Sequence, residues 1–223
     1  MMRKAVSGLF IGLVFASLAG WAQTSKDGVI KLNGGRTAVL GTAPVQPFTP
    51  AVQPSSKLVK IYSNLGKGDH VYSTLAGYGI LGPNAGQPWP QMVGTGFRPK
   101  ADYLVTLVQV AATYLQGTNA LVVSLNQDNH DAPGKVLHTW HFKDLPEAWS
   151  CCTLQTGKYA KGIPVKKGKL YWVVVRPETK FPDTYDIFPD NYAEKSGHHF
   201  SNNIGSGWDT SYQVLGAVGV FGR

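Results

Sequence analysis

Short apolar runs separated by glycine- and proline-rich turns, without an amphipathic helical period, are the feature that most constrains the fold of this chain. Leu121, Val123 and Leu125 alternate with a second set of residues that includes Ser124 and Asn126. An alternation of this kind is typical of a half-buried strand, because successive side chains of a strand point to opposite faces. Only 15% of the residues are charged and 26 are glycine, as is typical of extracellular all-β proteins with many turns.

The pattern therefore predicts an all-β fold, an antiparallel β-sandwich with a jelly-roll-like arrangement of about eight strands. An immunoglobulin-like topology is the competing arrangement. The expected strands are Leu58–Ser63, Tyr103–Ala112, Thr118–Gln127, Lys135–Phe142, Trp149–Leu154, Leu170–Arg176, His198–Asn202 and Tyr212–Phe221.

The first 22 residues have the layout of a secretory signal peptide. A basic start, Met1–Lys4, precedes the apolar run Ala5–Ala19, and small residues follow at the expected cleavage site before Gln23. The run is short and diluted for a membrane span, so we expect export to the periplasm or the outside, with no transmembrane anchor after cleavage.

Residues 23–57 are predicted to be an extended proline- and glycine-rich leader, and residues 58–223 to be the β-sandwich domain. The leader is expected either to space the domain from a surface or to pack along it.

The chain is basic, with a formal net charge of +8, but its cationic residues form no long block. The densest group flanks a predicted turn and consists of Lys158, Lys161, Lys166, Lys167 and Lys169. Nucleic-acid binding requires a concentrated basic face with interleaved aromatic residues, so no nucleic-acid partner is predicted. A solvated loop surface is the favoured interpretation, and weak attraction to anionic cell-surface polymers is the alternative.

The two cysteines, Cys151 and Cys152, are adjacent. In an exported protein we expect a disulfide between them, which would form a rigid apolar knob against Trp149 or part of a binding floor. The alternatives are two reduced cysteines on opposite faces of a strand, or intermolecular pairing. The spacing does not match a redox or zinc motif.

Six tryptophans and ten tyrosines are more than one small core needs. Aromatic faces beside polar side chains suit sugar rings, which have apolar faces and hydroxyl edges. The candidate ligand-binding residues are Trp208, Trp89, Asp209, Tyr185 and Tyr192. For the two tryptophans, which we expect in loops, simple packing over a sandwich edge is the alternative.

Asp128 and Asp131 lie in a dense turn that ends in Pro133-Gly134. Their carboxylates could hold a structural calcium ion, the only cofactor predicted. Turn formation by aspartate and asparagine side chains explains the same residues without a metal.

The segment Phe181–Glu194 is predicted to be a loop that carries four acidic residues, Asp183, Asp186, Asp190 and Glu194. Paired carboxylates across a cleft could hydrolyse a glycosidic bond. No recognisable nucleophile or metalloprotease motif accompanies them, and no catalytic residue is predicted.

Several segments resemble those of secreted bacterial proteins that contain a "choice-of-anchor" β-sandwich domain. The matching segments are Tyr62–Gly66, Ser124–Asp128, Ala132–Gly134, Trp149–Cys152, Gly205–Trp208 and Leu215–Ala217. The resemblance covers about residues 58–223 and implies a β-sandwich with no established activity.

Three hypotheses about function follow. The first is an exported, non-catalytic β-sandwich that binds an extracellular or cell-envelope ligand, such as a polysaccharide, through loop aromatic residues. The second is a structural or surface-interaction protein whose aromatic residues stabilise the fold. The third is a glycoside hydrolase. No oligomeric state is predicted.

Overall fold

In the computed structural model, residues 29–32, 36–39 and 58–223 are described, and all the regular structure among them is β-strand. The strands are β1 (Val29–Leu32), β2 (Arg36–Val39), β3 (Val59–Ser63), β4 (Tyr72–Leu81), β5 (Met92–Phe97), β6 (Tyr103–Ala111), β7 (Thr113–Gln116), β8 (Ala120–Asp128), β9 (Pro133–Lys143), β10 (Leu154–Val165), β11 (Tyr171–Pro177), β12 (Tyr185–Asn191), β13 (Ser196–Asn203), β14 (Trp208–Val214) and β15 (Val218–Gly222). Within the described residues, no helix is long and apolar enough to cross a membrane.

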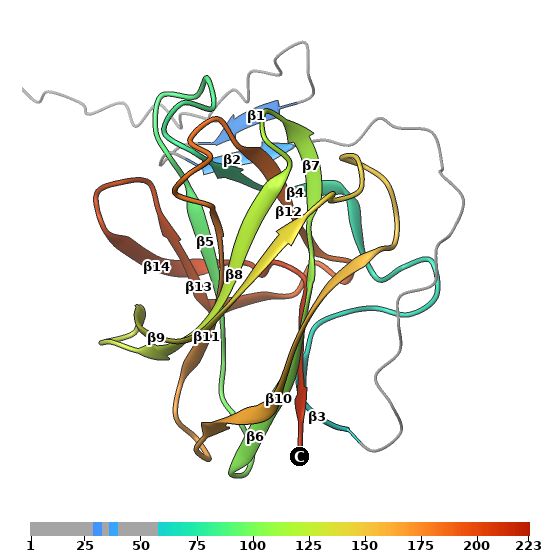
Figure 1. The fold of residues 1–223 in the computed structure, drawn as a ribbon, viewed down its shortest axis with the longest axis vertical. Helices are drawn as coiled ribbons and strands as arrows, with labels where there is room; N and C mark the ends of the chain where they lie inside the picture. Colours follow the sequence, from blue (N-terminus) through green and yellow to red (C-terminus); the bar gives the residue numbers. More distant parts are fainter. Residues whose placement is uncertain (1–28, 33–35, 40–57) are drawn as a thin grey trace, which may run out of the picture.

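The strands form two layers (Figure 1). One layer combines the sheets β1-β2-β4-β12-β7 and β10-β6-β15-β3, which lie end to end because β6 runs almost directly into β7. The other layer is the sheet β14-β13-β5-β11-β8-β9, and the paired strands are antiparallel. This confirms the predicted all-β antiparallel sandwich.

Eight strand positions in the two layers follow the jelly-roll order. In the first layer, β3 and β4 share the first position, β12 and β15 share the second, β6 and β7 share the third, and β10 occupies the fourth. In the second layer they are β5, β11, β8 and β9. The chain crosses between the layers at nearly every connection, and the late strands β12 and β15 lie between early ones, as in a jelly roll and unlike the immunoglobulin alternative.

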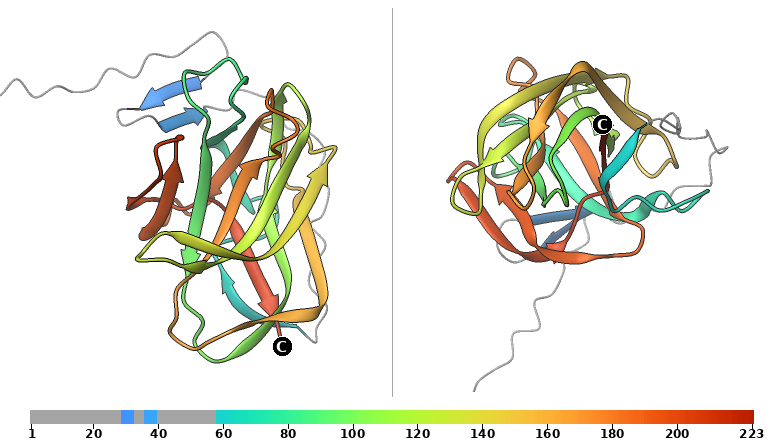
Figure 2. Two further views of the ribbon diagram at one scale, coloured as in Figure 1. Left: turned by 60° about the vertical axis from the view of Figure 1, so that its left-hand side comes forward. Right: turned by 90° about the horizontal axis from the view of Figure 1, so that it is seen from below.

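Two hairpins extend these sheets at their edges. The hairpin of β13 and β14 is added to β5. The hairpin of β1 and β2 is added to β4 through the pairing of Ala38 with Tyr78 (Figure 2, left). Because β1 and β2 belong to the predicted leader 23–57, part of that segment pairs with the domain. The signal peptide prediction, residues 1–22, lies outside the described residues.

Several expected strand boundaries were wrong. Trp149 to Thr153 forms a loop, and Tyr212–Phe221 is divided into β14 and β15. Strands β4 and β5 each contain two glycines, which indicate turns in a sequence. In β4 a glycine is needed because a Cβ at Gly77 would lie 2.8 Å from the carbonyl oxygen of Phe188 on the neighbouring strand.

The main core lies between the two layers and is built from alternate residues of their strands. On β11, Tyr171, Val173 and Val175 face this core. The intervening Trp172 and Val174 form a smaller apolar cluster on the outer face of the same sheet. The strand is therefore buried on both faces, which explains why its sequence is a continuous apolar run.

Candidate functional site

The predicted acidic loop 181–194 is wrong in its central part, because residues 185–191 form strand β12 in the middle of a sheet. Asp186 and Asp190 each lie two residues from Phe188 along β12, so all three side chains are on the same face of the strand. Phe188 belongs to the main core. Asp186 is fully buried. These two carboxyl groups therefore point into the sandwich, where a polysaccharide cannot reach them.

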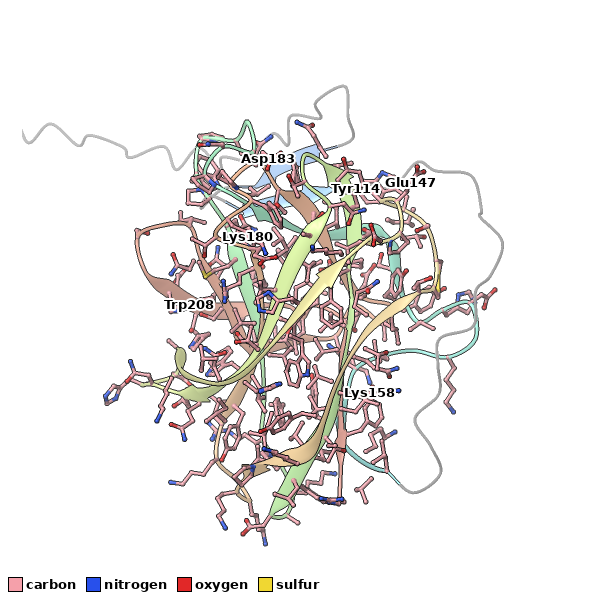
Figure 3. The ribbon with its side chains drawn as sticks, viewed as in Figure 1. Tyr114, Glu147, Lys158, Lys180, Asp183 and Trp208 are labelled. Carbon is pink, nitrogen blue, oxygen red and sulfur yellow. A yellow bond between two sulfur atoms is a disulfide. The ribbon has the colours of Figure 1, made fainter. Side chains whose placement is uncertain are left out.

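Burial is the main cause of the raised pKa values of both carboxyl groups. Loss of solvation raises the pKa of Asp186 to about 8. The same effect, with a smaller contribution from the charge of Glu194, raises the pKa of Asp190 to about 7. Among the described residues, neither side-chain oxygen of Asp186 has a hydrogen-bond partner. The exposed Asp183 accepts a hydrogen bond of 2.8 Å from the Thr118 hydroxyl at the upper end of the molecule (Figure 3).

Trp208, predicted to lie in a loop, is the first residue of β14 and packs against the outer cluster around Trp172. Asp209, the next residue, is exposed. Trp89 does lie in a loop, between β4 and β5, where it is half-buried. Its neighbour Pro90 lies against Gly205 in the turn before Trp208. The fold thus brings the Trp89 loop and the β13–β14 turn together.

The two candidate tyrosines differ in their exposure to solvent. Tyr185 is only 2% exposed and belongs to a small apolar cluster with Leu81 and Ile187. Tyr192 is 48% exposed and stacks on His70, with ring centroids 4.4 Å apart. Of the five residues predicted to bind a ligand, Tyr192 is the exposed aromatic one.

Asp128 and Asp131 participate in bonds within the protein. One Asp128 carboxylate oxygen accepts a hydrogen bond of 2.9 Å from the Trp172 indole, and the other accepts one of 3.3 Å from the Asp131 amide. The turn also contacts β14, since Thr210 donates to the Asp131 carbonyl oxygen at 2.6 Å. Among the side chains that the structure describes, which leave out those of residues 198–200, no three His, Cys, Asp or Glu residues gather in a metal-binding group. Calcium binding here stays a prediction.

The loop between β9 and β10 is a second candidate. Cys151 and Cys152 are joined by a disulfide in this loop, and Cys152 is fully buried. The two sulfur atoms lie 3.4 and 3.3 Å from the carbonyl oxygen of Asp69. Because a disulfide sulfur carries no proton, these are contacts and not hydrogen bonds.

The backbone of this loop is fixed by neighbouring strands. The Tyr114 amide donates to the Pro146 carbonyl oxygen at 2.7 Å, and the Ala148 amide donates to the Tyr114 carbonyl oxygen at 2.6 Å. Figure 3 shows Tyr114 and Glu147 side by side at this point. The Tyr72 hydroxyl donates to the Ser150 carbonyl oxygen at 3.0 Å, and burial raises the pKa of that phenol to about 12.

Trp149 has a backbone φ of 74°, in the left-handed region that bulky residues rarely adopt. The hydrogen bonds on either side of it hold this conformation. Unusual backbone conformations of this kind tend to cluster at functional sites. The position of this indole is therefore determined by the loop and not by local preference.

A narrow hollow lies between this loop and the outer face of β4, β7 and β12. Its floor includes Ile187 and Pro189, and none of its lining residues is charged. The aromatic and hydroxyl-bearing residues that line it are Tyr72, Ser73, Thr74, Thr113, Trp149 and Ser150. Within the described residues, the buried Thr113 hydroxyl has no hydrogen-bond partner.

The hollow and the exposed aromatic pair belong to one surface, which we call the disulfide face and define as residues 66–73, 147–152 and 191–194. Asp69 contacts the disulfide, and the adjacent His70 stacks on Tyr192. Figure 3 shows the disulfide, in yellow, beside the loop that joins β3 and β4. Tyr192 and the two cysteines are predicted from the sequence. Trp149 lies in a loop and not in the expected strand, and the hydroxyl-bearing residues of the hollow carry no motif that marks them.

Comparisons of the chain with protein-family models, curated proteins and solved structures give no match. The resemblance to choice-of-anchor domains stays a prediction.

Proposed function

We propose that this protein is an exported, non-catalytic β-sandwich that binds a neutral polysaccharide across the disulfide face. The observation that carries the proposal is the uncharged hollow, which combines the Trp149 indole with a set of hydroxyl groups. Export rests on the basic start and apolar run of residues 1–22.

The chemistry of a sugar matches this surface. A pyranose has an apolar face that stacks on an aromatic ring and a rim of hydroxyl groups that need hydrogen-bond partners. Trp149 and Tyr192 offer two aromatic surfaces, and the hollow is narrow enough that we expect a sugar ring to lie across its mouth. The carboxylates of Asp69 and Glu194, both on exposed residues of this face, can accept hydrogen bonds from sugar hydroxyls.

The loop is also held in place before a ligand arrives. Its backbone hydrogen bonds and its disulfide reduce the conformational freedom that binding would otherwise remove. A binding module that recognises a polymer by a few stacking contacts benefits from this arrangement, because each contact contributes little and ordering costs would offset it.

The test is affinity electrophoresis of the purified protein in gels that contain one neutral polysaccharide each. Tyr192→Ala removes the exposed ring, and Tyr212→Ala is the matched control, because Tyr212 is 58% exposed on β14 and is not one of the residues that define the disulfide face. We expect one polysaccharide to retard the native protein and the control but not the Tyr192 variant. Absence of retardation across the panel, or equal retardation of both variants, contradicts the proposal.

A structural role is the second candidate, and the packing of the tryptophans favours it. Trp172 and Trp140 are buried, and Trp208 packs on the outer cluster. If the aromatic residues act only in this way, Trp208→Ala lowers the free energy of unfolding and no polysaccharide retards the protein. Retardation that depends on Tyr192 decides against this alternative.

A further inference from the structure

One end of the sandwich collects cationic residues from four separate parts of the chain. We call it the basic end and define it as residues 58–61, 97–105, 163–171 and 221–223. The strand registers bring these parts together, because Tyr103 pairs with Val165, Phe97 with Tyr171, and Gly222 with Val105. In Figure 1 this is the lower end, where the chain reaches Arg223, and Figure 2 shows it from below.

The charge of this end is strongly unbalanced. Its exposed cationic side chains are those of Lys60, Arg98, Lys100, Lys166, Lys167, Lys169 and Arg223. Asp102 is the one acidic residue in these segments, and it forms an ion pair with Lys166 at 2.9 Å. The hydrogen bond and charge of Lys166 lower the pKa of Asp102, so this carboxylate stays ionised and offsets a single positive charge. Side chains that end in nitrogen project from this end in Figure 3.

The turns that carry these residues are tied to one another. The Gly168 amide donates to the Pro99 carbonyl oxygen at 2.9 Å, and the Arg98 guanidinium donates to the Gly168 carbonyl oxygen at 3.1 Å. The Lys167 amide donates to the Asp102 carboxylate at 2.8 Å. The like charges are therefore held close together by the fold, although they repel one another.

A shallow hollow opens beside these turns. Tyr103, Lys166 and Arg223 are among its lining residues, and so is Asp102, the ion-pair partner of Lys166. A guanidinium group can bind a carboxylate with two parallel hydrogen bonds, and a lysine adds a mobile point charge. The hollow thus combines the Arg223 guanidinium and the Tyr103 ring with a lysine whose charge is offset by Asp102. Lys167 and Lys169, unpaired within the described residues, lie on the adjacent turn.

We propose that the basic end binds an anionic polysaccharide whose repeating acidic sugars neutralise several of these side chains at once. The repulsion among the fixed cations favours a ligand that carries many negative charges along one chain. Among polyanions we select a polysaccharide because export would place the protein among polymers of the cell envelope. The inference goes beyond the proposed function, because it uses a different surface and a charged ligand.

The test measures binding of the purified protein to immobilised polygalacturonate by biolayer interferometry, at two salt concentrations. Methyl-esterified polygalacturonate, which has the same backbone without the charge, is the ligand control. Lys167→Gln/Lys169→Gln removes two charges from the basic end. Lys143→Gln/Lys195→Gln is the matched control, since it removes the same charge from exposed lysines elsewhere.

We expect polygalacturonate to bind and its ester not to bind, with weaker binding at higher salt. The affinity should fall about tenfold in the Lys167/Lys169 variant and less than about twofold in the control variant. Equal losses in both variants would show that net charge alone drives binding, and would overturn the proposal. Tighter binding to single-stranded DNA or to anionic lipid vesicles at equal salt would overturn it in favour of a different partner.

Discussion

Replacement of Asp186 by asparagine should stabilise this protein at neutral and alkaline pH. In the native protein the carboxyl group is fully buried beside the main core, and its pKa is raised from 3.8 to about 8 by loss of solvation. Neither of its oxygens has a hydrogen-bond partner among the described residues. Asparagine has nearly the shape of the protonated acid but never ionises, so folding of the variant does not require a carboxyl group to hold a proton that the unfolded chain releases.

The sign follows from proton linkage. Between pH 3.8 and about 8 the folded state keeps a proton on Asp186 that the unfolded state has released. The stabilising effect of this proton is complete below the unfolded pKa, and it is lost as the pH rises through the folded pKa. Each pH unit in this window lowers the free energy of unfolding by about 1.4 kcal/mol. From pH 5 to pH 8 the loss from this one group is about 3.5 kcal/mol.

The assay is urea denaturation of the native protein and of Asp186→Asn at pH 5, 6, 7 and 8. We expect the difference in free energy of unfolding between the variant and the native protein to grow in favour of the variant by about 3.5 kcal/mol from pH 5 to pH 8. Asp190, whose pKa is also raised, titrates in both proteins and cancels in the difference. A difference that does not change with pH would refute the reasoning.

Two further predictions concern packing. Asn64→Ala should lower the free energy of unfolding, measured by urea denaturation, by about 2–4 kcal/mol. The buried side-chain amide of Asn64 donates to the Gly216 carbonyl oxygen at 2.9 Å and accepts from the Val218 amide at 2.7 Å. A loss below about 1 kcal/mol would argue against this prediction. Gly157→Ala should cost about 1–3 kcal/mol and change the near-ultraviolet circular dichroism of Trp140, since a Cβ at Gly157 would lie 2.5 Å from the indole. An unchanged spectrum and stability would contradict this second prediction.

Strands with strong apolar alternation could be predicted from the sequence, whereas β4 and β5, with two glycines each, and the acidic β12 could not. The run 121–125 and the run 171–175 are recognisable because their side chains face apolar surroundings. Strand β12 was mistaken for a loop because Asp186 and Pro189 are typical of loops. Only neighbouring strands, β4 and β7, make that segment extended and buried.

The candidate site could be predicted in part for a related reason. Adjacency alone was enough to suggest the disulfide of Cys151 and Cys152, because the two residues are neighbours in the chain. The hollow beside it depends on Thr113 and Ser73, which come from different strands and carry no recognisable motif. Sequence spacing does not show such groupings.

Local patterns in the sequence were enough to predict short antiparallel strands, because the alternation of side chains and the turn residues act over a few residues. The tertiary structure decided which side chains share a surface. Lys167 and Arg98 are far apart in the sequence but belong to turns that hydrogen-bond to each other. Burial, charge repulsion and hydrogen bonding depend on distances in space, and the fold sets those distances by pairing strands from distant parts of the chain.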